Sequence, residues 1–423
     1  MSGDTLIVGA SQAGLQIAVT MRQLGDTSRI TLVGEEAHPP YQRPPLSKEY
    51  LSGTADLASL DFRAPGFYEE SGIELVCGER VATLTPDGAR PGAGVAVTDK
   101  GRTLPYERLA LTVGSRPRRL GLPGSELDGI CVLRDRDDAV GLRARLLDAS
   151  QVAVIGGGFI GLEAAAVARA LGRDVTVVET APRLMGRAVA PVVSDFYRAA
   201  HQRRGSRVLL DTAVTAFTGD REGRVTGVRL TDGSHVPADL VLVGIGAEPR
   251  TELAHQLGLV CEGGIVVDAA ARTSEPAVFA AGDCTVQPHP TTGEGLVRLE
   301  SVQNAVAQAT AAGAALAGAA QPARAVPWFW SYQGDLKLQI AGLSAGHDEL
   351  VVRGDPEAER FSVLYYRRGT LLAADAVNSP ADYMAVRKAL GQGATIPAHL
   401  AADSAASLKA AIVPANDAVL PTS

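Results

Sequence analysis

One motif occurs twice in this chain, and it limits the possible folds more than any other feature. Each copy has an apolar run, a glycine-rich turn, a helical run, a second apolar run and a final acidic residue. The first copy extends from Thr5 to Glu35, and the second extends from Val152 to Glu179. This is the order of a strand, a helix and a second strand, so the sequence predicts two βαβ units in an α/β fold.

The glycines of each turn have the spacing of a phosphate-binding turn. The first glycine, Gly9 or Gly156, permits a tight turn, and the last, Gly14 or Gly161, lets the helix pack closely on the strand. Gly158 lets the backbone approach a pyrophosphate, which the N-terminus of the following helix attracts. We therefore expect a dinucleotide site at each turn.

The acidic residues and their neighbours indicate which nucleotide binds. In the first copy Ser11 replaces the middle glycine, which leaves less room for a phosphate. Glu35 and Glu179 have the spacing expected for a carboxylate that accepts from the ribose hydroxyls of adenosine. Because Glu179 would repel a 2′-phosphate, we expect NADH rather than NADPH at the second site. Arg183 and Arg187 could each contact the adenine or a phosphate, or remain solvated charges.

Two dinucleotide sites in one chain suggest a flavoprotein, with FAD in one site and NAD(P)H in the other. Two later stretches support this interpretation. A strand over 109–112 ends at a glycine turn with Gly114, and a second strand ends at Gly282. Asp283 follows directly and can accept from a ribityl hydroxyl.

The composition excludes several other classes of protein. With 40 basic and 47 acidic residues the formal net charge is −7, which argues against a nucleic-acid-binding protein. The four cysteines form no CxxC pair, so we expect neither a disulfide scaffold nor a metal site, and we expect a reducing cytoplasm. Met1–Asp4 lacks the basic start of a signal peptide. The stretch 309–322 is too short for a membrane span and is expected to form a buried Ala-rich helix.

The chain resembles the FAD-dependent NADH:ferredoxin reductases of bacterial oxygenase systems over about residues 5–400. That family includes the putidaredoxin and rubredoxin reductases and the reductase of biphenyl dioxygenase. The motifs that carry the resemblance are Pro40–Leu51, Gly156–Glu163, Val278–Asp283, Arg298–Ala305 and Pro327–Ser331. The resemblance implies a glutathione-reductase-like fold. Such a chain has two Rossmann-type βαβ domains, followed by a C-terminal α+β domain.

The resemblance also assigns residues to the two cofactors. For FAD it implies contacts at Gly9, Ala13, Gly14, Glu35, Arg43, Lys48, Val81, Gly114, Arg134, Gly282, Asp283, Val302 and Trp330. For NADH it implies contacts at Gly156, Gly158, Ile160, Gly161, Glu179, Arg187 and Gly246. Trp330 would lie near the flavin on the ferredoxin side, although Trp328 and Trp330 could equally be a core pair.

Lys48 and Glu163 are the catalytic residues that the resemblance implies. Lys48 would place a cation near flavin N5, and Glu163 would orient it and help to seat the nicotinamide. Read alone, Lys48 could be an ordinary surface charge. The enzyme would pass electrons from NADH through FAD to a [2Fe–2S] ferredoxin, which would supply a cytochrome P450 or a Rieske-type oxygenase.

The positions of the cysteines separate this function from its alternatives. Residues 38–51 hold no cysteine and the nearest is Cys77, so disulfide and peroxide chemistry are not expected. Cys284, beside Asp283, is expected to have a packing role. One alternative is an NADH oxidase or diaphorase without an iron–sulfur partner. Another is a redox-responsive interaction protein, for which no targeting or basic segment is visible.

The motifs predict three domains, one of them split in sequence. The FAD domain would comprise 1–117 and 244–323, the NADH domain 118–243, and the C-terminal domain 324–423. Alternating apolar residues predict antiparallel strands in the C-terminal domain over 336–340, 349–353, 361–366 and 370–374. Helices are expected over 380–390 and 404–411, followed by a frayed tail over 413–423. We expect a monomer that binds no membrane.

Overall fold

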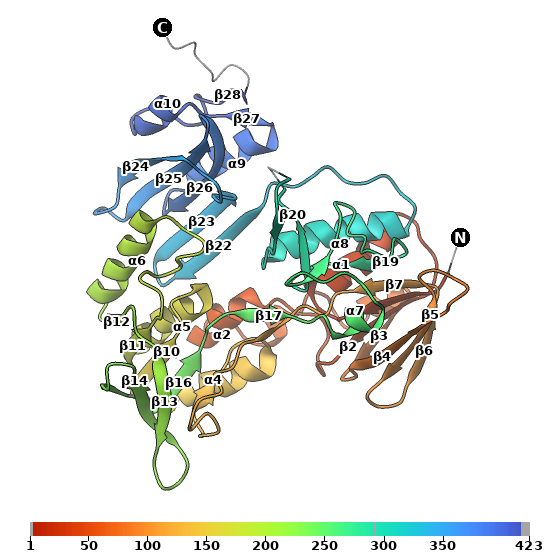
Figure 1. Ribbon diagram of the computed structural model, residues 1–423, viewed down its shortest axis with the longest axis horizontal. Coiled ribbons are helices and arrows are strands. Elements are labelled where there is room, and N and C mark those ends of the chain that lie inside the picture. The colour runs from red at the N-terminus through yellow and green to blue at the C-terminus, as the bar shows by residue number, and fades with distance from the viewer. Residues whose placement is uncertain (1–2, 291–292, 416–423) are drawn as a thin grey trace. The chain divides into compact units, whose positions relative to one another are not determined.

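The computed structural model describes residues 3–290 and 293–415, which form two compact units (Figure 1). Unit 1 comprises the residues up to 42 together with 58–116 and 247–325. Unit 2 comprises 43–57, 117–246 and the residues from 326 onward. The segment 43–57 therefore lies with the second βαβ unit, although the sequence analysis placed it in the first part of the FAD domain.

A parallel sheet of five strands forms the centre of unit 1. In spatial order its strands are β19 (Val278–Ala280), β7 (Arg108–Leu111), β1 (Thr5–Val8), β2 (Ile30–Gly34) and β3 (Ile73–Cys77). The strands are apolar runs because both faces of a parallel sheet are covered. Ile7 and Leu32 are fully buried in this core.

Two helices of unit 1 pack side by side, α1 (Gln12–Gln23) and α8 (Val302–Leu316) (Figure 1). They approach closely at Gly313, where a Cβ would lie 2.8 Å from the Cβ of Thr20. The Ala-rich helix predicted over 309–322 corresponds to α8, which begins earlier and ends at Leu316, so the prediction is wrong for 317–322. Small residues let α8 pack tightly against α1. Among the described residues, no helix is long and apolar enough to cross a membrane.

Smaller elements complete unit 1. One three-stranded sheet contains β4 (Val81–Pro86), β5 (Gly94–Thr98) and β6 (Thr103–Tyr106). Another contains β18 (Ile265–Val266), β20 (Thr285–Pro288) and β21 (Leu296–Val297). The short helices are η2 (Ala58–Leu60), α3 (Phe67–Glu70) and α7 (Glu252–Gln256). A two-stranded sheet joins β8 (Ser115–Pro117) and β17 (Ala247–Pro249).

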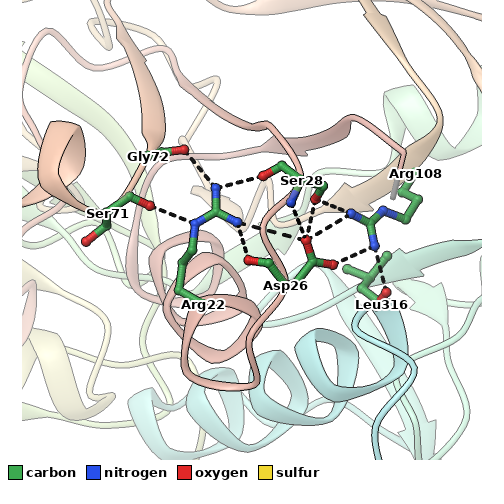
Figure 2. A network of polar contacts seen from close by, with 7 residues as sticks. All are labelled: Arg22, Asp26, Ser28, Ser71, Gly72, Arg108 and Leu316. Carbon is green, nitrogen blue, oxygen red and sulfur yellow. Dashed lines mark hydrogen bonds and ion pairs between the residues drawn. The ribbon is translucent and has the colours of Figure 1, made fainter. Parts of the chain in front are cut away.

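A network of polar contacts connects separate elements of unit 1 (Figure 2). The Asp26 carboxylate, just before β2, accepts from the guanidinium of Arg108 on β7 and from the backbone N–H of Ser28, both at 2.8 Å. Arg108 also donates to the carbonyl of Leu316 at the end of α8, at 2.8 Å. Arg22 on α1 donates to the carbonyls of Asp26 and Ser28 at 2.7 and 2.8 Å. Two arginines and one carboxylate thus join α1, α8 and two strands.

The second parallel sheet lies in unit 2 and also has five strands. Its strands in spatial order are β12 (Arg207–Leu209), β11 (Asp174–Val178), β10 (Gln151–Ile155), β16 (Leu240–Val243) and β9 (Ile130–Cys131). The helices are α4 (Arg136–Asp148), α5 (Phe159–Ala170) and α6 (Pro191–Arg203). An antiparallel sheet contains β13 (Val214–Gly219), β14 (Val225–Leu230) and β15 (His235–Pro237).

The C-terminal part of unit 2 is an antiparallel sheet with helices, as the alternating pattern predicted. Its strands in spatial order are β22 (Trp328–Gln333), β23 (Leu336–Gly342), β26 (Thr370–Val377), β25 (Arg360–Arg367) and β24 (Glu349–Asp355). Helix α9 (Pro380–Gly391) packs on β23 and β26. The predicted strands and the first predicted helix are confirmed.

The predicted helix over 404–411 is wrong, because these residues form turns. The short helix α10 (Ala398–Ala402) lies earlier in the chain. The guanidinium of Arg353 donates to the carbonyls of Ser404 and Ala406, at 3.4 and 2.5 Å, and so directs them away from helical partners. A frayed tail was predicted over 413–423, but its first two residues are ordered. They form β28 (Val413–Pro414), which pairs with β27 (Ala394–Thr395). The rest of that tail, 416–423, lies outside the described residues.

Candidate cofactor sites

The glycine turns of the two βαβ units have nearly the same geometry. Gly9 and Gly156 have φ angles of +115° and +109°, a region that favours glycine. A Cβ on Gly14 would lie 2.1 Å from the carbonyl oxygen of Gly9, and one on Gly161 would lie 2.4 Å from that of Gly156. A Cβ on Gly158 would meet nothing within 4 Å. The outer glycines are thus required by the fold, whereas Gly158 leaves open space where a ligand could approach.

The start of α5 is suited to an anion. Gly158 is the N-cap of this helix and has no side chain, so it supplies no side-chain cap to the N–H groups of the first turn. Such N–H groups and the positive end of the helix dipole bind phosphates. Ile160, in the first turn of α5, is 45% exposed, so an apolar side chain is open to a ligand there. This arrangement fits a pyrophosphate at the second turn.

The two predicted ribose acids have different partners. Glu179 directly follows β11, and its carboxylate accepts from the backbone N–H groups of Gly157 and Ala181 at 2.6 and 2.7 Å. These bonds hold it beside the second glycine turn. Glu35 follows β2 and forms an ion pair with Arg250, a partner that the sequence did not indicate.

The structure distinguishes the two arginines near Glu179. Arg183 donates to the carbonyls of Gly186 and Val189 at 2.5 and 2.6 Å, so it holds the loop before α6 in place. Arg187 is exposed, and a Cβ on Gly246 would lie 3.7 Å from its guanidinium. Of the two, Arg187 is therefore the one whose charge faces a predicted cofactor position.

Several predicted FAD residues meet at one edge of the unit 1 sheet. The parallel strands β1, β7 and β19 end together there, and ligands bind at this edge in open α/β sheets. Gly114 and Gly282 have φ angles of +65° and +88°, and a Cβ on Gly282 would lie 3.4 Å from the Cβ of Ala13. Asp283 accepts from Ser115 at 3.3 Å, and Val302 begins α8.

Gln308 is a buried polar residue at this edge that the sequence analysis did not single out. Its Oε1 accepts from the backbone N–H of Gly282 at 2.8 Å and from the Thr285 hydroxyl at 2.9 Å. These bonds fix the turn that precedes Asp283. An amide side chain flanked by alanines in the middle of an Ala-rich helix was the signal that could have indicated it.

The predicted catalytic pair is present as an ion pair in unit 2. Lys48 Nζ lies 2.7 Å from Glu163 Oε2, and the side chains are 12% and 1% exposed. The hydroxyls of Ser47 and Ser331 also donate to the Glu163 carboxylate, at 2.6 and 2.7 Å. The 3-10 turn η1 (Pro44–Ser47), with prolines at its start, and α2 (Glu49–Ser52) pack on α5 and so present Lys48 to Glu163.

Three donors around one carboxylate explain how Glu163 is tolerated in the core. A buried ion is costly unless it is paired and hydrogen-bonded, and removal of one partner leaves the other charge uncompensated. Lys48 is further held by the carbonyl of Pro44 at 3.1 Å. The interpretation of Lys48 as an ordinary surface charge does not fit this burial.

The remaining predicted FAD residues are divided between the units. Val81 is buried at the start of β4 in unit 1. Arg43, Arg134 and Trp330 lie in unit 2, where Arg43 donates to the carbonyl of Arg134 at 2.8 Å. The half-buried rings of Trp330 and Trp328 lie 5.5 Å apart.

The cysteines do not favour thiol chemistry. Cys284 is fully buried, and burial raises the pKa of its thiol to about 12. Burial also raises the pKa of Cys77, the last residue of β3. Since the thiolate is the reactive form, these shifts support a packing role for Cys284.

The fold and the two glycine turns define a chain with two dinucleotide-binding folds, and comparisons with known proteins agree. The family model described as "Pyridine nucleotide-disulphide oxidoreductase" matches residues 3–309, and the model "Reductase C-terminal" matches residues 328–412. The chain belongs to the pyridine nucleotide-disulphide oxidoreductase family. This match confirms the predicted fold class.

The relatives are similar over nearly the whole chain. Rhodocoxin reductase of Rhodococcus erythropolis is 43% identical over 97% of this chain and 95% of its own. The solved ferredoxin reductase of the CYP199A2 system from Rhodopseudomonas palustris is 42% identical, with a TM-score of 0.91 over 97% of this chain and 100% of its own. A reductase in a covalent putidaredoxin reductase–putidaredoxin complex is 36% identical, with a TM-score of 0.91 over 96% and 97%. The resemblance that the motifs indicated is confirmed.

Proposed function

We propose that this chain is an FAD-dependent reductase that takes electrons from NADH and delivers them to a [2Fe–2S] ferredoxin. The ferredoxin would in turn supply an oxygenase such as a cytochrome P450. The observation that carries the proposal is the presence of two glycine turns on two separate parallel sheets of one chain. The names of the relatives, which are ferredoxin and putidaredoxin reductases, support the same function.

The first turn, with Gly9, Gly14 and Asp283 near the same sheet edge, would hold FAD. The second turn would hold NADH, with Gly158 at the pyrophosphate and Glu179 at the adenosine ribose. When bound, the two cofactors would supply the electron-transfer chemistry. The chain itself supplies orientation, a water-excluding core and the paired charge of Lys48.

Lys48 would act as the cation beside the flavin, and Glu163 would fix its position. A preorganised charge costs no reorganisation when negative charge develops on the ring next to it. The buried Glu163 carboxylate keeps Lys48 in one place, because the 2.7 Å ion pair is reinforced by two serine hydroxyls.

The experiment that tests the function is NADH-driven reduction of cytochrome c with and without [2Fe–2S] ferredoxins. We expect fast turnover only when a ferredoxin is added. Turnover at the full rate without any ferredoxin would instead favour an NADH oxidase or diaphorase and would contradict the proposal. The monomeric state and the cytoplasmic location remain predictions from the sequence.

The preference for NADH is a separate prediction that rests on Glu179. Its carboxylate is fixed beside the second turn by two backbone N–H groups, and it would repel a 2′-phosphate. We expect a higher kcat/KM with NADH than with NADPH. The Glu179→Gln variant should bring the two kcat/KM values closer together, because it removes the negative charge. A higher kcat/KM with NADPH in the unmodified protein would contradict this role of Glu179.

A further inference from the structure

A chain of buried polar side chains leads from the Lys48–Glu163 pair to helix α6. Glu163 Oε1 accepts from the hydroxyl of Ser331 on β22 at 2.7 Å. Gln333, two residues further along β22, lies with Nε2 3.4 Å from that hydroxyl oxygen. Its Oε1 lies 2.8 Å from Nε2 of His201 on α6. These four residues are at most 4% exposed.

The carboxylate fixes the direction of every hydrogen bond in this chain. An ionised carboxylate only accepts, so Ser331 must donate its one proton to Glu163. The lone pairs of Ser331 are then left for the amide N–H of Gln333, which turns the Gln333 carbonyl oxygen toward His201. His201 must therefore carry a proton on Nε2. The acceptor oxygen of Glu163 thus sets the tautomer of His201, a residue that it does not touch.

The surroundings of the chain leave few other partners for it. Gln333 Nε2 otherwise lies 3.6 Å from Met185 Sδ. The charged group that faces His201 is Arg204, whose guanidinium forms ion pairs with Asp335 and Glu359 at 2.9 and 2.6 Å. Burial lowers the pKa of His201 and so favours the neutral imidazole. Arg204 lowers this pKa too, whereas the hydrogen bond with Gln333 acts in the opposite direction. A neutral ring with one fixed tautomer is a rigid end for the chain.

We propose that Ser331, Gln333 and His201 are positioning residues that hold Glu163 in the orientation in which it pairs with Lys48. With Oε1 fixed by Ser331, Oε2 faces Lys48 and Ser47. This inference rests on the proposed function for the role of Lys48 in hydride transfer. The hydrogen-bond chain itself is a property of the protein alone.

The first test separates positioning from mere packing. Ser331→Ala and Gln333→Met each interrupt the chain, and Ser362→Ala is a matched control. Ser362 is also fully buried on the same sheet and donates to a carboxylate, that of Asp382, at 3.0 Å. The readouts are the limiting rate of flavin reduction by NADH and the NADH concentration at half-saturation, both measured by stopped flow on the FAD-loaded enzyme without ferredoxin.

We expect all three variants to lose similar thermal stability. Only Ser331→Ala and Gln333→Met should slow flavin reduction, by about 2- to 30-fold, with the NADH concentration at half-saturation unchanged. Limiting rates equal to that of Ser362→Ala would overturn the proposal.

The second test does not depend on activity. In Glu163→Gln, Lys48 and Ser47 require the oxygen of the new amide, so its NH₂ group faces Ser331. Ser331 must then donate to Gln333, whose NH₂ group turns to His201. The proton of His201 should therefore move from Nε2 to Nδ1.

Nuclear magnetic resonance of the full-length, histidine-labelled protein distinguishes the two tautomers. The His201 signals are assigned by comparison with His201→Asn. An Nε2–H tautomer in the unmodified protein and an Nδ1–H tautomer in Glu163→Gln would support the chain. The same tautomer in both would overturn it. A failure to reduce ferredoxin would count against the proposed function and would leave both tests of the chain intact.

Discussion

At the scale of single residues, two buried carboxylates of unit 2 have opposite environments. Glu163 accepts from three side-chain donors. Asp375 is fully buried on β26 and accepts from the Tyr365 hydroxyl, but its Oδ1 has no hydrogen-bond partner among the described residues. Burial raises the pKa of Asp375 to about 7, despite the lowering effect of the Tyr365 bond. Glu163 thus has donors on both of its oxygens, whereas Asp375 has a donor on one oxygen and favours its neutral form.

The Lys48–Glu163 pair predicts a specific loss of activity. Lys48→Ala and Glu163→Ala should each slow flavin reduction by NADH by about 100-fold, the effect of losing a preorganised charge contact. Lys337→Ala is a matched control, because Lys337 is an exposed lysine of the same unit. Stopped-flow rates at wild-type level in both variants would show that the pair has no part in the reaction.

Asp375 predicts how stability depends on pH. Its carboxyl keeps its proton up to about pH 7 when folded, whereas the unfolded group has a pKa of 3.8. The folded state thus binds more protons between these values, and stability falls as pH rises through them, by up to about 1.4 kcal/mol per unit. Asp375→Asn should remove this slope, as thermal melts at pH 5 and 8 would show. If the melting temperatures at pH 5 and pH 8 differed as much in Asp375→Asn as in the unmodified protein, the role of Asp375 would be contradicted.

At the scale of elements, sequence patterns correctly predicted the helices and strands whose structure depends on residues nearby in the chain. Glycine spacing and apolar runs identified both βαβ units, because the turn geometry depends on a few neighbouring residues. The helix over 404–411 was mispredicted because Arg353, far away in sequence, donates to two carbonyls of that region. The roles of Gln308 and Gln333 were missed for the same reason, since their partners lie in distant segments.

Two glycines of the second turn should respond differently to the same substitution. In Gly161→Ala the new methyl group would lie 2.4 Å from a backbone oxygen, so we expect a loss of about 1–3 kcal/mol in stability. In Gly158→Ala it would meet nothing within 4 Å, so stability should stay nearly unchanged while NADH binds more weakly. Thermal melts and NADH titrations check both. Unaltered NADH affinity in Gly158→Ala would argue against a cofactor at this turn.

At the scale of the whole molecule, each unit is assembled from three separate stretches of chain. The chain passes between the units five times, after residues 42, 57, 116, 246 and 325. The polar network of Asp26 helps to keep unit 1 together, because it links elements from both ends of that unit (Figure 2). Such long-range contacts hold together stretches of unit 1 that are far apart in sequence, which contacts between neighbouring residues cannot do.

The Asp26 network predicts a loss of stability in acid. Burial alone would raise the pKa of Asp26, but hydrogen bonds from Arg108 and Ser28 lower it to about 2. The stabilisation is therefore complete above about pH 4 and disappears as pH falls toward 2. Asp26→Asn should lower stability at pH 7 by on the order of 2 kcal/mol, and the difference should vanish near pH 2. Asp195→Asn, at an exposed position, is the control for melts across this range.

The discontinuity of the units also governs how the chain can fold during synthesis. The unit 1 sheet lacks its edge strand β19 until residues 278–280 have left the ribosome, and the Lys48–Glu163 pair lacks Ser331 until still later. The first βαβ segment must therefore wait, with its apolar strands incompletely covered, while most of the polypeptide is made. A nascent-chain chaperone acting during this interval would protect these strands from aggregation until the rest of unit 1 has been made.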